Sequence, residues 1–288
     1  MEAFLTVVIA TIGESTLNRT IKSLVVSSIV PDRILVCIPK ERQGDLPRLD
    51  EFGTIVEIIP TEESGQVLQR ARGFRAVSSK YTLQLDSDVI LEKNCLETLI
   101  SFLEIHPKAA VAPQIYDGKT GEYHSYLTAG SSKFSKFDLS LLFYLANGRD
   151  GYRPGSISKC GENFGTIEGD GPTKCDWLPG GCILHHSENL VLENYFPFKG
   201  KAYGEDVLHS YFLTQRNIDL VQLPNARIEM FFPSHEFSGL REMRRIQWRA
   251  FRIKFHIAGL LGKSRLRLTA YTVVYHIILL KRRLFDGH

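Results

Sequence analysis

Apolar runs alternate with segments of helical composition over the first third of the chain. Four of these runs read as strands: residues 4–10, 34–38, 54–59 and 81–85. The first is β-branched and apolar without polar alternation, which is typical of a strand buried on both faces. Three neighbouring segments have helical composition: residues 16–28, 65–77 and 94–105. Strands that alternate with helices indicate a parallel sheet with helices on its faces. We therefore predict an α/β fold with a Rossmann-like, mostly parallel sheet flanked by helices.

Polar side chains stand where the first and fourth predicted strands end. Thr11 and Glu14 follow the first strand, and Asp86, Ser87 and Asp88 follow the apolar part of the fourth. Ligands of such sheets bind at the carboxyl ends of the strands, so these residues are candidates for one site. Two carboxylates one residue apart can approach one Mg²⁺ or Mn²⁺ ion, which prefers oxygen ligands and shares its shell with substrate phosphates. The alternative is that the two acids only cap the helix that follows.

The composition changes from Asp117 to Pro172, where Gly, Ser, Lys and Tyr replace most apolar runs. A long irregular segment of this kind is either a substrate loop or a disordered insertion. Apolar signal returns at residues 177–184, and a helix over 205–215 and a short strand over 218–223 are predicted after it. We divide the chain into two halves of one domain and a C-terminal helical extension: residues 1–110, 111–238 and 239–288.

Five short motifs follow one another along residues 5 to about 240. They are Val7-Val8-Ile9-Ala10-Thr11, Gln69-Arg70-Ala71-Arg72-Gly73, Leu85-Asp86-Ser87-Asp88, Trp177-Leu178-Pro179-Gly180-Gly181 and Tyr203-Gly204-Glu205-Asp206, with Ser234-His235-Glu236 after them. In this order the motifs resemble those of the family 2 glycosyltransferases, which have the GT-A fold. Two departures fall in the family's donor site. Ala71 replaces the usual Asn, and Ile38-Pro39-Lys40-Glu41 lacks the usual acidic residue after the second strand, so the nucleotide stays open.

The resemblance implies a role for each of these residues. Residues 1–110 would bind a nucleotide-sugar donor, a UDP- or dTDP-sugar, through Thr11, Glu14, Arg70, Asp86 and Ser87. Mn²⁺ or Mg²⁺ would lie on the donor diphosphate, held by Asp88, Asp86 and His235. Residues 111–238 would bind a saccharide acceptor through Trp177, Gly180 and Gly181. Asp206, with Glu205 beside it, would take the proton of the acceptor hydroxyl, and the transfer would invert the anomeric carbon.

Two other functions are compatible with a fold of this kind. A sugar nucleotidyltransferase opens with a Gly-rich, Arg-containing loop after the first strand, which residues 11–16 lack. A non-catalytic carbohydrate- or membrane-binding protein would be indicated by the loss of either carboxylate set, and both sets are intact. Glycosyl transfer is therefore the preferred prediction.

Residues 239–288 have the pattern of basic amphipathic helices. The arginines at helical spacing are Arg241, Arg244, Arg245, Arg249 and Arg252, and apolar residues such as Ile246, Phe251 and Phe255 recur on another face. Helices of this type tend to lie in a membrane interface. We expect contact with an anionic membrane surface and a lipid-linked acceptor, as in surface-polysaccharide synthesis. The alternative is that the apolar face packs on the core. Nucleic acid is not expected, because phosphate contact requires no sustained apolar face.

The cysteines and the hydropathy of the chain predict its location. Five cysteines without a Cys-x-x-Cys pair indicate free thiols in a reducing compartment. A zinc site is a remote alternative, because the spacing of the candidate ligands fits no zinc pattern: Cys160, Cys175, Cys182, His185 and His186. No apolar stretch reaches the ~20 residues that span a bilayer. We expect a cytoplasmic protein, peripheral at the inner face of the cytoplasmic membrane.

Overall fold

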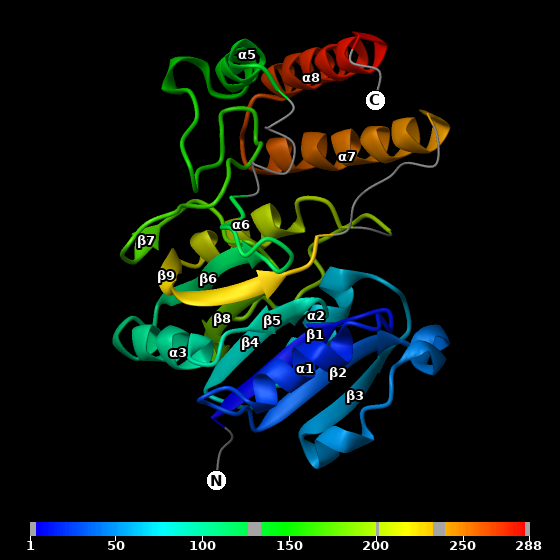
Figure 1. The fold of residues 1–288 in the computed structure, drawn as a ribbon, viewed down its shortest axis with the longest axis vertical. Helices are drawn as coiled ribbons and strands as arrows, with labels where there is room; N and C mark the ends of the chain where they lie inside the picture. Colours follow the sequence, from blue (N-terminus) through cyan, green and yellow to red (C-terminus); the bar gives the residue numbers. More distant parts are fainter. Residues whose placement is uncertain (1–3, 126–133, 200–201, 233–239, 286–288) are drawn as a thin grey trace. The chain divides into compact units, whose positions relative to one another are not determined.

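One mixed sheet of nine strands organises the fold (Figure 1). The computed structural model describes residues 4–125, 134–199, 202–232 and 240–285. In chain order the strands are β1 (Leu5–Ala10), β2 (Arg33–Pro39), β3 (Val56–Thr61), β4 (Tyr81–Asp86), β5 (Val89–Leu91), β6 (Ala109–Asp117), β7 (Thr173–Lys174), β8 (Cys182–His186) and β9 (Asp219–Met230). Their order in the sheet is β3-β2-β1-β4-β8-β6-β9-β5, and β7 also pairs with β9.

The N-terminal part of the sheet is parallel, as the alternation of strands and helices predicts. β1 pairs with β2 and β4, and β2 pairs with β3, all in parallel. Ala10 lies opposite Asp86 in the register of β1 and β4, so the polar residues that follow these strands lie side by side. β8 pairs antiparallel with β4 and β6, and β5 and β7 pair antiparallel with β9. The α/β sheet flanked by helices is confirmed, and it is mixed beyond β4.

β6 is a central strand that the sequence did not predict. Its first four residues are three alanines and a valine, and Pro113 interrupts the run. Alanine and proline are both depleted in strands, so the segment lacks the usual signal. The register between β6 and β9 shifts at Pro113 and Gln114, where the structure accommodates the proline as an irregularity. β9 also continues seven residues beyond the predicted end at Leu223.

Four helices accompany the sheet: α1 (Leu17–Val25), α2 (Gln66–Phe74), α3 (Cys95–Ile105) and α6 (Glu205–Gln215). α1 and α2 are shorter than the predicted ranges 16–28 and 65–77, whereas α3 and α6 match their predictions to within a residue. Phe74 of α2 packs on the sheet face that carries Val8, Leu35 and Cys37. This contact fixes the helix that carries Arg70 against β1 and β2.

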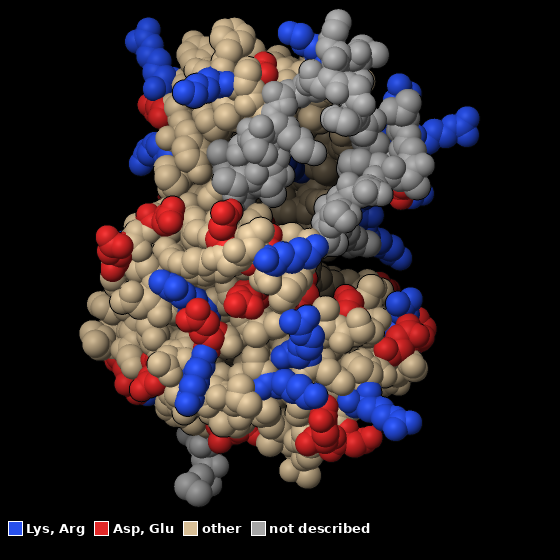
Figure 2. Space-filling model, viewed as in Figure 1, with Lys and Arg blue, Asp and Glu red and all other residues tan. Residues whose placement is uncertain are grey.

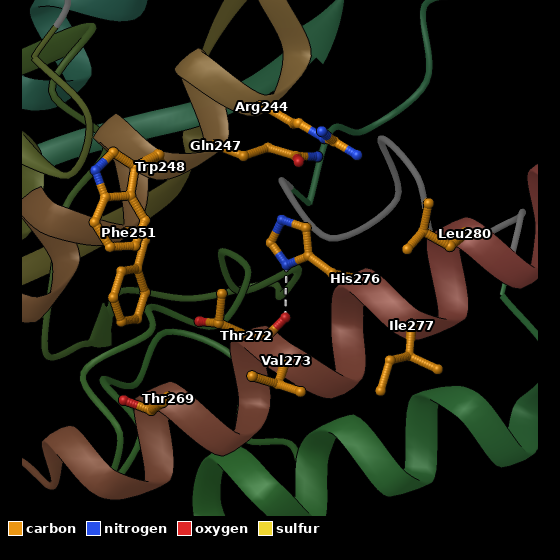
Figure 3. A pocket seen from close by; sticks show the side chains of 10 residues that line it. All are labelled: Arg244, Gln247, Trp248, Phe251, Thr269, Thr272, Val273, His276, Ile277 and Leu280. Atoms are coloured by element: carbon orange, nitrogen blue, oxygen red, sulfur yellow. Dashed lines mark hydrogen bonds between the residues drawn. The ribbon is translucent and has the colours of Figure 1, made fainter. Parts of the chain in front are cut away.

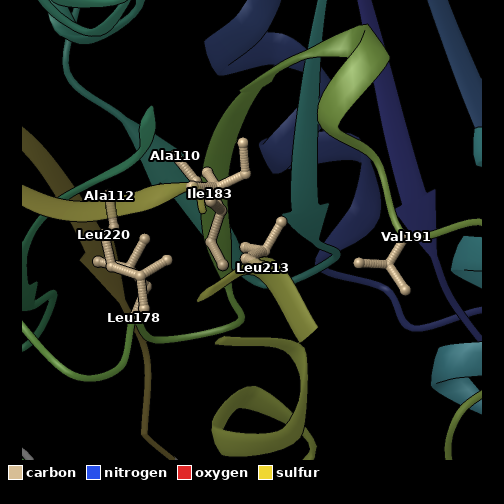
Figure 4. Packing of buried hydrophobic residues seen from close by; sticks show 8 residues of the cluster. Ala110, Ala112, Leu178, Ile183, Val191, Leu213 and Leu220 are labelled. Carbon is tan, nitrogen blue, oxygen red and sulfur yellow. The ribbon is translucent and has the colours of Figure 1, made fainter. Parts of the chain in front are cut away.

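A second apolar cluster packs around β6, β8, β9 and α6 (Figure 4). Its buried members are Ala110, Ala112, Leu178, Ile183, Val191, Leu213, Ile218 and Leu220. Leu213 belongs to α6, so the cluster holds that helix, whose first turn carries Glu205 and Asp206, in place against the sheet.

The chain divides into two compact units, and the sheet belongs to the first one, Met1–His124 with Ile167–Phe232. The second unit, Ser125–Thr166 with Pro233–His288, contains α5 (Lys136–Asn147), α7 (Leu240–Leu260) and α8 (Arg265–Phe285). The segment 117–172, predicted as a loop or an insertion, thus contributes a helix, and its residues 125–166 share a unit with the C-terminal helices. The predicted boundaries at residues 110 and 238 stay predictions.

The second unit has its own core. Ala146, Cys160, Phe164, Ala258 and Leu268 are buried together, and they join α5, α7 and α8. Lys254 of α7 pairs with Glu162 at 2.6 Å beside this core. Part of the apolar face of the C-terminal helices is therefore covered within the unit. Among the described helices, none has a stretch long and apolar enough to cross a bilayer.

A substitution at Gly73 would test how α2 packs on the sheet. A Cβ atom at this position would lie 2.4 Å from Val8 Cγ1 and 2.7 Å from Cys37 Sγ, both in buried strands. We expect Gly73→Ala to destabilise the fold by about 1–3 kcal/mol in urea denaturation, because the core cannot shift cheaply. Gly44→Ala is the control, since a Cβ atom there meets nothing within 4 Å. An equal free energy of unfolding for both variants would contradict this packing.

Candidate functional site

A cluster of polar side chains lies where β1 and β4 end, beside the first turn of α6. Asp86 is the last residue of β4, and Ser87 and Asp88 form the turn into β5. Arg70 comes from α2, and Gly180 and Gly181 precede β8. These residues come from two parts of the chain, 70–88 and 180–206, and Figure 1 shows the elements that carry them in the sheet unit.

The Arg70 guanidinium connects three of these elements. One terminal nitrogen lies 2.6 Å from Glu205 Oε1, and the other lies 2.6 Å from Asp86 Oδ1 and donates to the Gly180 carbonyl oxygen at 3.1 Å. Arg70 is only 2% exposed. A buried cation needs opposite charges with good geometry, and the planar fork of arginine can serve two carboxylates at once. Although burial opposes the charged form, the carboxylates of Glu205 and Asp86 raise the pKa of Arg70.

The two glycines before β8 allow this close approach. A Cβ atom on Gly180 would lie 2.5 Å from Glu205 Oε1, and one on Gly181 would lie 3.4 Å from Asp86 Oδ2. Gln84 donates to the Gly180 carbonyl at 2.6 Å, and the Asp86 backbone N–H donates to the Gly181 carbonyl at 2.8 Å. Gly180 and Gly181 therefore lie within the carboxylate cluster, and their predicted contact with an acceptor stays a prediction. Trp177 is 1% exposed, so its ring supports this segment from inside.

A second network holds the turn after β1. Glu14 Oε2 accepts hydrogen bonds from Thr11 Oγ1, from the Ile12 N–H at 3.1 Å and from Ser87 Oγ at 3.1 Å. Burial raises the pKa of Glu14, but these hydrogen bonds outweigh it and the pKa is lowered, so the carboxylate stays ionised. Thr20 Oγ1 donates to the Ser87 carbonyl at 2.9 Å. Thr11, Glu14 and Ser87, which the sequence placed at two strand ends, are thus in direct contact.

Glu205 and Asp206 occupy the first turn of α6 and differ in their surroundings. Gly204 precedes them with φ +70°, a left-handed conformation that glycine adopts without strain. Burial raises the pKa of Glu205, and Arg70 opposes this effect. Asp206 accepts from the Val207 N–H at 2.9 Å. Burial, and then the neighbouring Glu205 carboxylate, raise the pKa of Asp206 to about 7, although part of its side chain is accessible.

Three glutamines support the site and were not identified from the sequence. Gln66 donates to Asp86 Oδ1 at 3.0 Å, and Gln69 donates to the carbonyl oxygens of Thr11 and Cys37, both at 2.7 Å. Gln84, described above, fixes Gly180. On α2, Gln66 stands four residues before Arg70 and three before Gln69, so it shares a helix face with each of them, and this spacing was the available signal.

Two buried histidines lie behind Arg70. His185 of β8 and His209 of α6 meet edge to face, with ring centroids 5.4 Å apart. Burial lowers the pKa of His185 to about 3 and that of His209 well below its usual range, so both rings are neutral. They therefore add no charge beside Arg70. No group of three or more His, Cys, Asp or Glu side chains that could hold a metal occurs among the described residues, and the zinc alternative gains no support.

The carboxylates Asp86 and Asp88 are the candidates for a divalent cation. Asp86 Oδ1 already accepts hydrogen bonds from Arg70 and Gln66. Oδ2 is therefore the carboxylate oxygen that is left to bind a metal ion. Oxygen donors suit Mg²⁺ and Mn²⁺, and such ions are often bound by one or two carboxylates together with substrate phosphates. The residues thus fit the chemistry of such an ion. The third predicted ligand, His235, lies outside the described residues.

The Arg70 ion pairs yield a test of stability. Arg70→Met leaves Glu205 as a buried carboxylate without its cation, and we expect a loss of about 3–5 kcal/mol in the free energy of unfolding. Adding Glu205→Leu to this variant should restore much of the loss, because the uncompensated charge is removed. Arg72→Met, on the exposed side of the same helix, is the control and should change stability by less than about 0.5 kcal/mol. Equal effects of the two arginine variants in guanidinium denaturation would contradict the central role of Arg70.

Comparisons with known proteins place the chain in a family. No curated protein sequence matches the chain. Among solved structures, the chain is similar to a crystal structure of GalNAc-T7 with UDP, GalNAc and Mn²⁺, with a TM-score of 0.58 and 18% identity. The match covers 85% of this chain and 47% of that one, so the chain spans about half the length of that protein, and the likeness concerns the fold. The family model of Glycosyl transferase family 2 matches residues 6–157, more than half of the 288 residues. The chain therefore belongs to glycosyl transferase family 2.

Proposed function

We propose that this chain transfers a sugar from a nucleotide-sugar donor to an acceptor hydroxyl, with inversion at the anomeric carbon. The observation that carries the proposal is the Arg70 network, which brings Asp86 at the end of β4 to the first turn of α6. A donor diphosphate at the strand end and an acceptor hydroxyl at Asp206 would then share one site. Family membership supports sugar transfer, and the carboxylates at both positions support catalysis over simple binding.

The donor would lie along the ends of β1 and β4. Thr11, Glu14 and Ser87 form one hydrogen-bonded group there, and Asp86 and Arg70 form the adjoining one. Because Glu14 and Asp86 are anionic, they suit hydroxyl and N–H donors of a nucleoside, whereas the phosphates need a cation. The similar solved structure contains UDP and Mn²⁺, so a UDP-sugar is the first donor to test and a dTDP-sugar the second.

A divalent cation would be held by Asp88 and Asp86, with His235 as a further candidate. When bound, Mn²⁺ or Mg²⁺ would neutralise the charge that develops on the diphosphate leaving group. The protein's own part is to hold Asp86 in one orientation through Arg70 and Gln66. Ser87 keeps the turn between the two acids in place through its contacts with Glu14 and Thr20.

Asp206 is the proposed general base. It would take the proton of the acceptor hydroxyl as that oxygen bonds to the anomeric carbon and the bond from this carbon to the diphosphate breaks. Its pKa of about 7 suits proton transfer near neutral pH, because an effective base has a pKa near the working pH. Glu205 would act as a positioning residue through Arg70. Trp177, Gly180 and Gly181 would shape the acceptor side, and the acceptor would be a saccharide, lipid-linked if the protein works peripherally at the inner face of the cytoplasmic membrane.

The base assignment predicts both a rate and a pH profile. Asp206→Asn should lower turnover about 10²–10⁴-fold, while donor affinity stays nearly constant. The wild-type rate should fall as the pH drops through about 7, because protonated Asp206 cannot accept a proton, and this limb should vanish in the variant. Glu188→Gln, an exposed acid elsewhere in the unit, is the control. Donor hydrolysis and transfer at several pH values are the measurements, and a variant with full turnover would remove Asp206 from this role.

The metal assignment predicts a binding phenotype. In calorimetry, Asp88→Asn should abolish the gain in UDP affinity that Mn²⁺ or Mg²⁺ provides, because one of two carboxylate ligands is lost. Glu92→Gln is the matched control, since Glu92 is an exposed acid four residues further along the chain. Retention of the full metal-dependent gain by Asp88→Asn would show that the cation is held elsewhere.

A further inference from the structure

A cavity of ≈ 560 Å³ opens between α7 and α8 of the second unit (Figure 3). Its lining combines five apolar or aromatic side chains of the two helices with five polar ones. Trp248 and Phe251 face it from α7, and Val273, Ile277 and Leu280 face it from α8. We call this cavity the α7–α8 groove. Its volume lies in the range that holds small molecules in proteins.

The groove leaves large apolar side chains in contact with water. Trp248 is 63% exposed, Ile277 57% and Val273 53%. The opposite sides of the same helices are covered, since Ile253, Ile257 and Leu268 are buried. The core of the unit thus uses one face of each helix and leaves the groove face open. Contiguous apolar surface of this kind marks an interaction site more often than ordinary surface.

Basic residues concentrate in the same segment. Residues 239–288 contain twelve of the 35 Lys and Arg residues of the chain but only two of its 32 Asp and Glu residues. On the face of the sheet unit that Figure 2 shows, in contrast, acidic and basic side chains are interspersed. A short connection joins the end of α7 to the start of α8, so the two helices form a hairpin. The start of α7 and the end of α8 lie together at the open end of this hairpin (Figure 1). That open end therefore carries the first arginines of α7 and Lys281 of α8.

The charges at the open end adjoin the groove. Arg244 lines it directly, and Arg244 and Trp248 share a helix face because they are four residues apart. Lys281 stands four residues after Ile277 on α8 and is exposed. His276 projects into the groove, and its Nδ1 lies 2.6 Å from the Thr272 carbonyl oxygen (Figure 3). An apolar groove with cations at one end matches a molecule with a hydrocarbon chain and an anionic head.

We propose that the α7–α8 groove binds the hydrocarbon chain of one anionic membrane phospholipid, with the lipid phosphate at the open end beside Arg244 and Lys281. Charge complementarity selects this occupant over a neutral lipid, and the apolar side chains that line the groove select it over a nucleic acid. The proposal deepens the membrane contact of the proposed function by naming the site and the ligand. Its test needs no sugar donor, so its failure would leave the transferase assignment unchanged.

Co-sedimentation of the full chain with vesicles tests the proposal, with tryptophan emission as a second readout. We expect binding to phosphatidylglycerol vesicles, weak binding to phosphatidylcholine vesicles and a blue shift from Trp248, because Trp177 is already buried. Ile277→Glu should weaken binding at least tenfold. Leu266→Glu is the matched control, because Leu266 is an 82% exposed apolar residue of α8 outside the groove and the charge change is the same. Arg244→Gln should weaken binding about fivefold, the effect of one cation near an anionic surface.

Several outcomes would overturn the proposal. Equal losses in the Ile277 and Leu266 variants would indicate general adsorption to the interface. Binding that requires a polyprenyl phosphate in phosphatidylcholine vesicles, with none to phosphatidylglycerol, would assign the groove to a carrier lipid. A lipid-free dimer in sedimentation velocity that Ile277→Glu abolishes would assign it to a second copy of the chain. Val273→Gln, also at an exposed lining position, replaces Ile277→Glu if circular dichroism shows that the latter is unfolded.

Discussion

The buried charge of Arg70 is the constraint on which the arrangement of the sheet unit depends. A guanidinium that is almost fully enclosed must have its opposite charges in place, and here they come from β4 and α6. The hydrogen bond to Gly180 adds the segment before β8. Three parts of the chain that are distant in sequence thus share one cation. Such a pair is weak evidence for stability in itself, but it fixes which groups lie together, because any other arrangement leaves a charge buried alone.

Glycine and glutamine residues allow and support the ion pairs of Arg70. Gly180 has no side chain because a Cβ atom would collide with Glu205, and Gln84 and Arg70 both donate to its carbonyl oxygen. Gln66 gives Asp86 Oδ1 a second donor. The neutral His185 and His209 lie behind the cluster and add no competing positive charge. The site is therefore preorganised by polar contacts within the protein, which is what an electrostatic contribution to catalysis requires.

The sequence predicted the parts of the fold whose signal is local. β1 and β2 contain continuous apolar runs, β4 is a short segment with Tyr, Thr and Leu, and α6 begins at an acidic first turn after Gly204, so all four were identified. β6 was missed because Ala and Pro113 hide a strand whose partners are distant in the chain. The packing of residues 125–166 with the C-terminal helices in one unit could not be predicted either, because no local sequence pattern encodes which distant segments pack together. The same reason explains why Thr11, Arg70 and Asp86 were identified by their motifs, while the contact of Arg70 with Glu205 was not.

The contact between Arg70 and Glu205 also separates the two acids of the first turn of α6. Glu205 shares its carboxylate with a cation, so its negative charge and its lone pairs are engaged in holding the site. Among the described residues, Asp206 has no ion pair, and the charge of Glu205 beside it favours its protonated form. Two neighbouring carboxylates with different surroundings can therefore take different tasks. The structural acid must keep its charge through its partner, and the acid that exchanges a proton must have a pKa near the working pH. This reasoning supports the proposal that Asp206 takes the proton of the acceptor, while Glu205 raises the pKa of its neighbour and anchors Arg70.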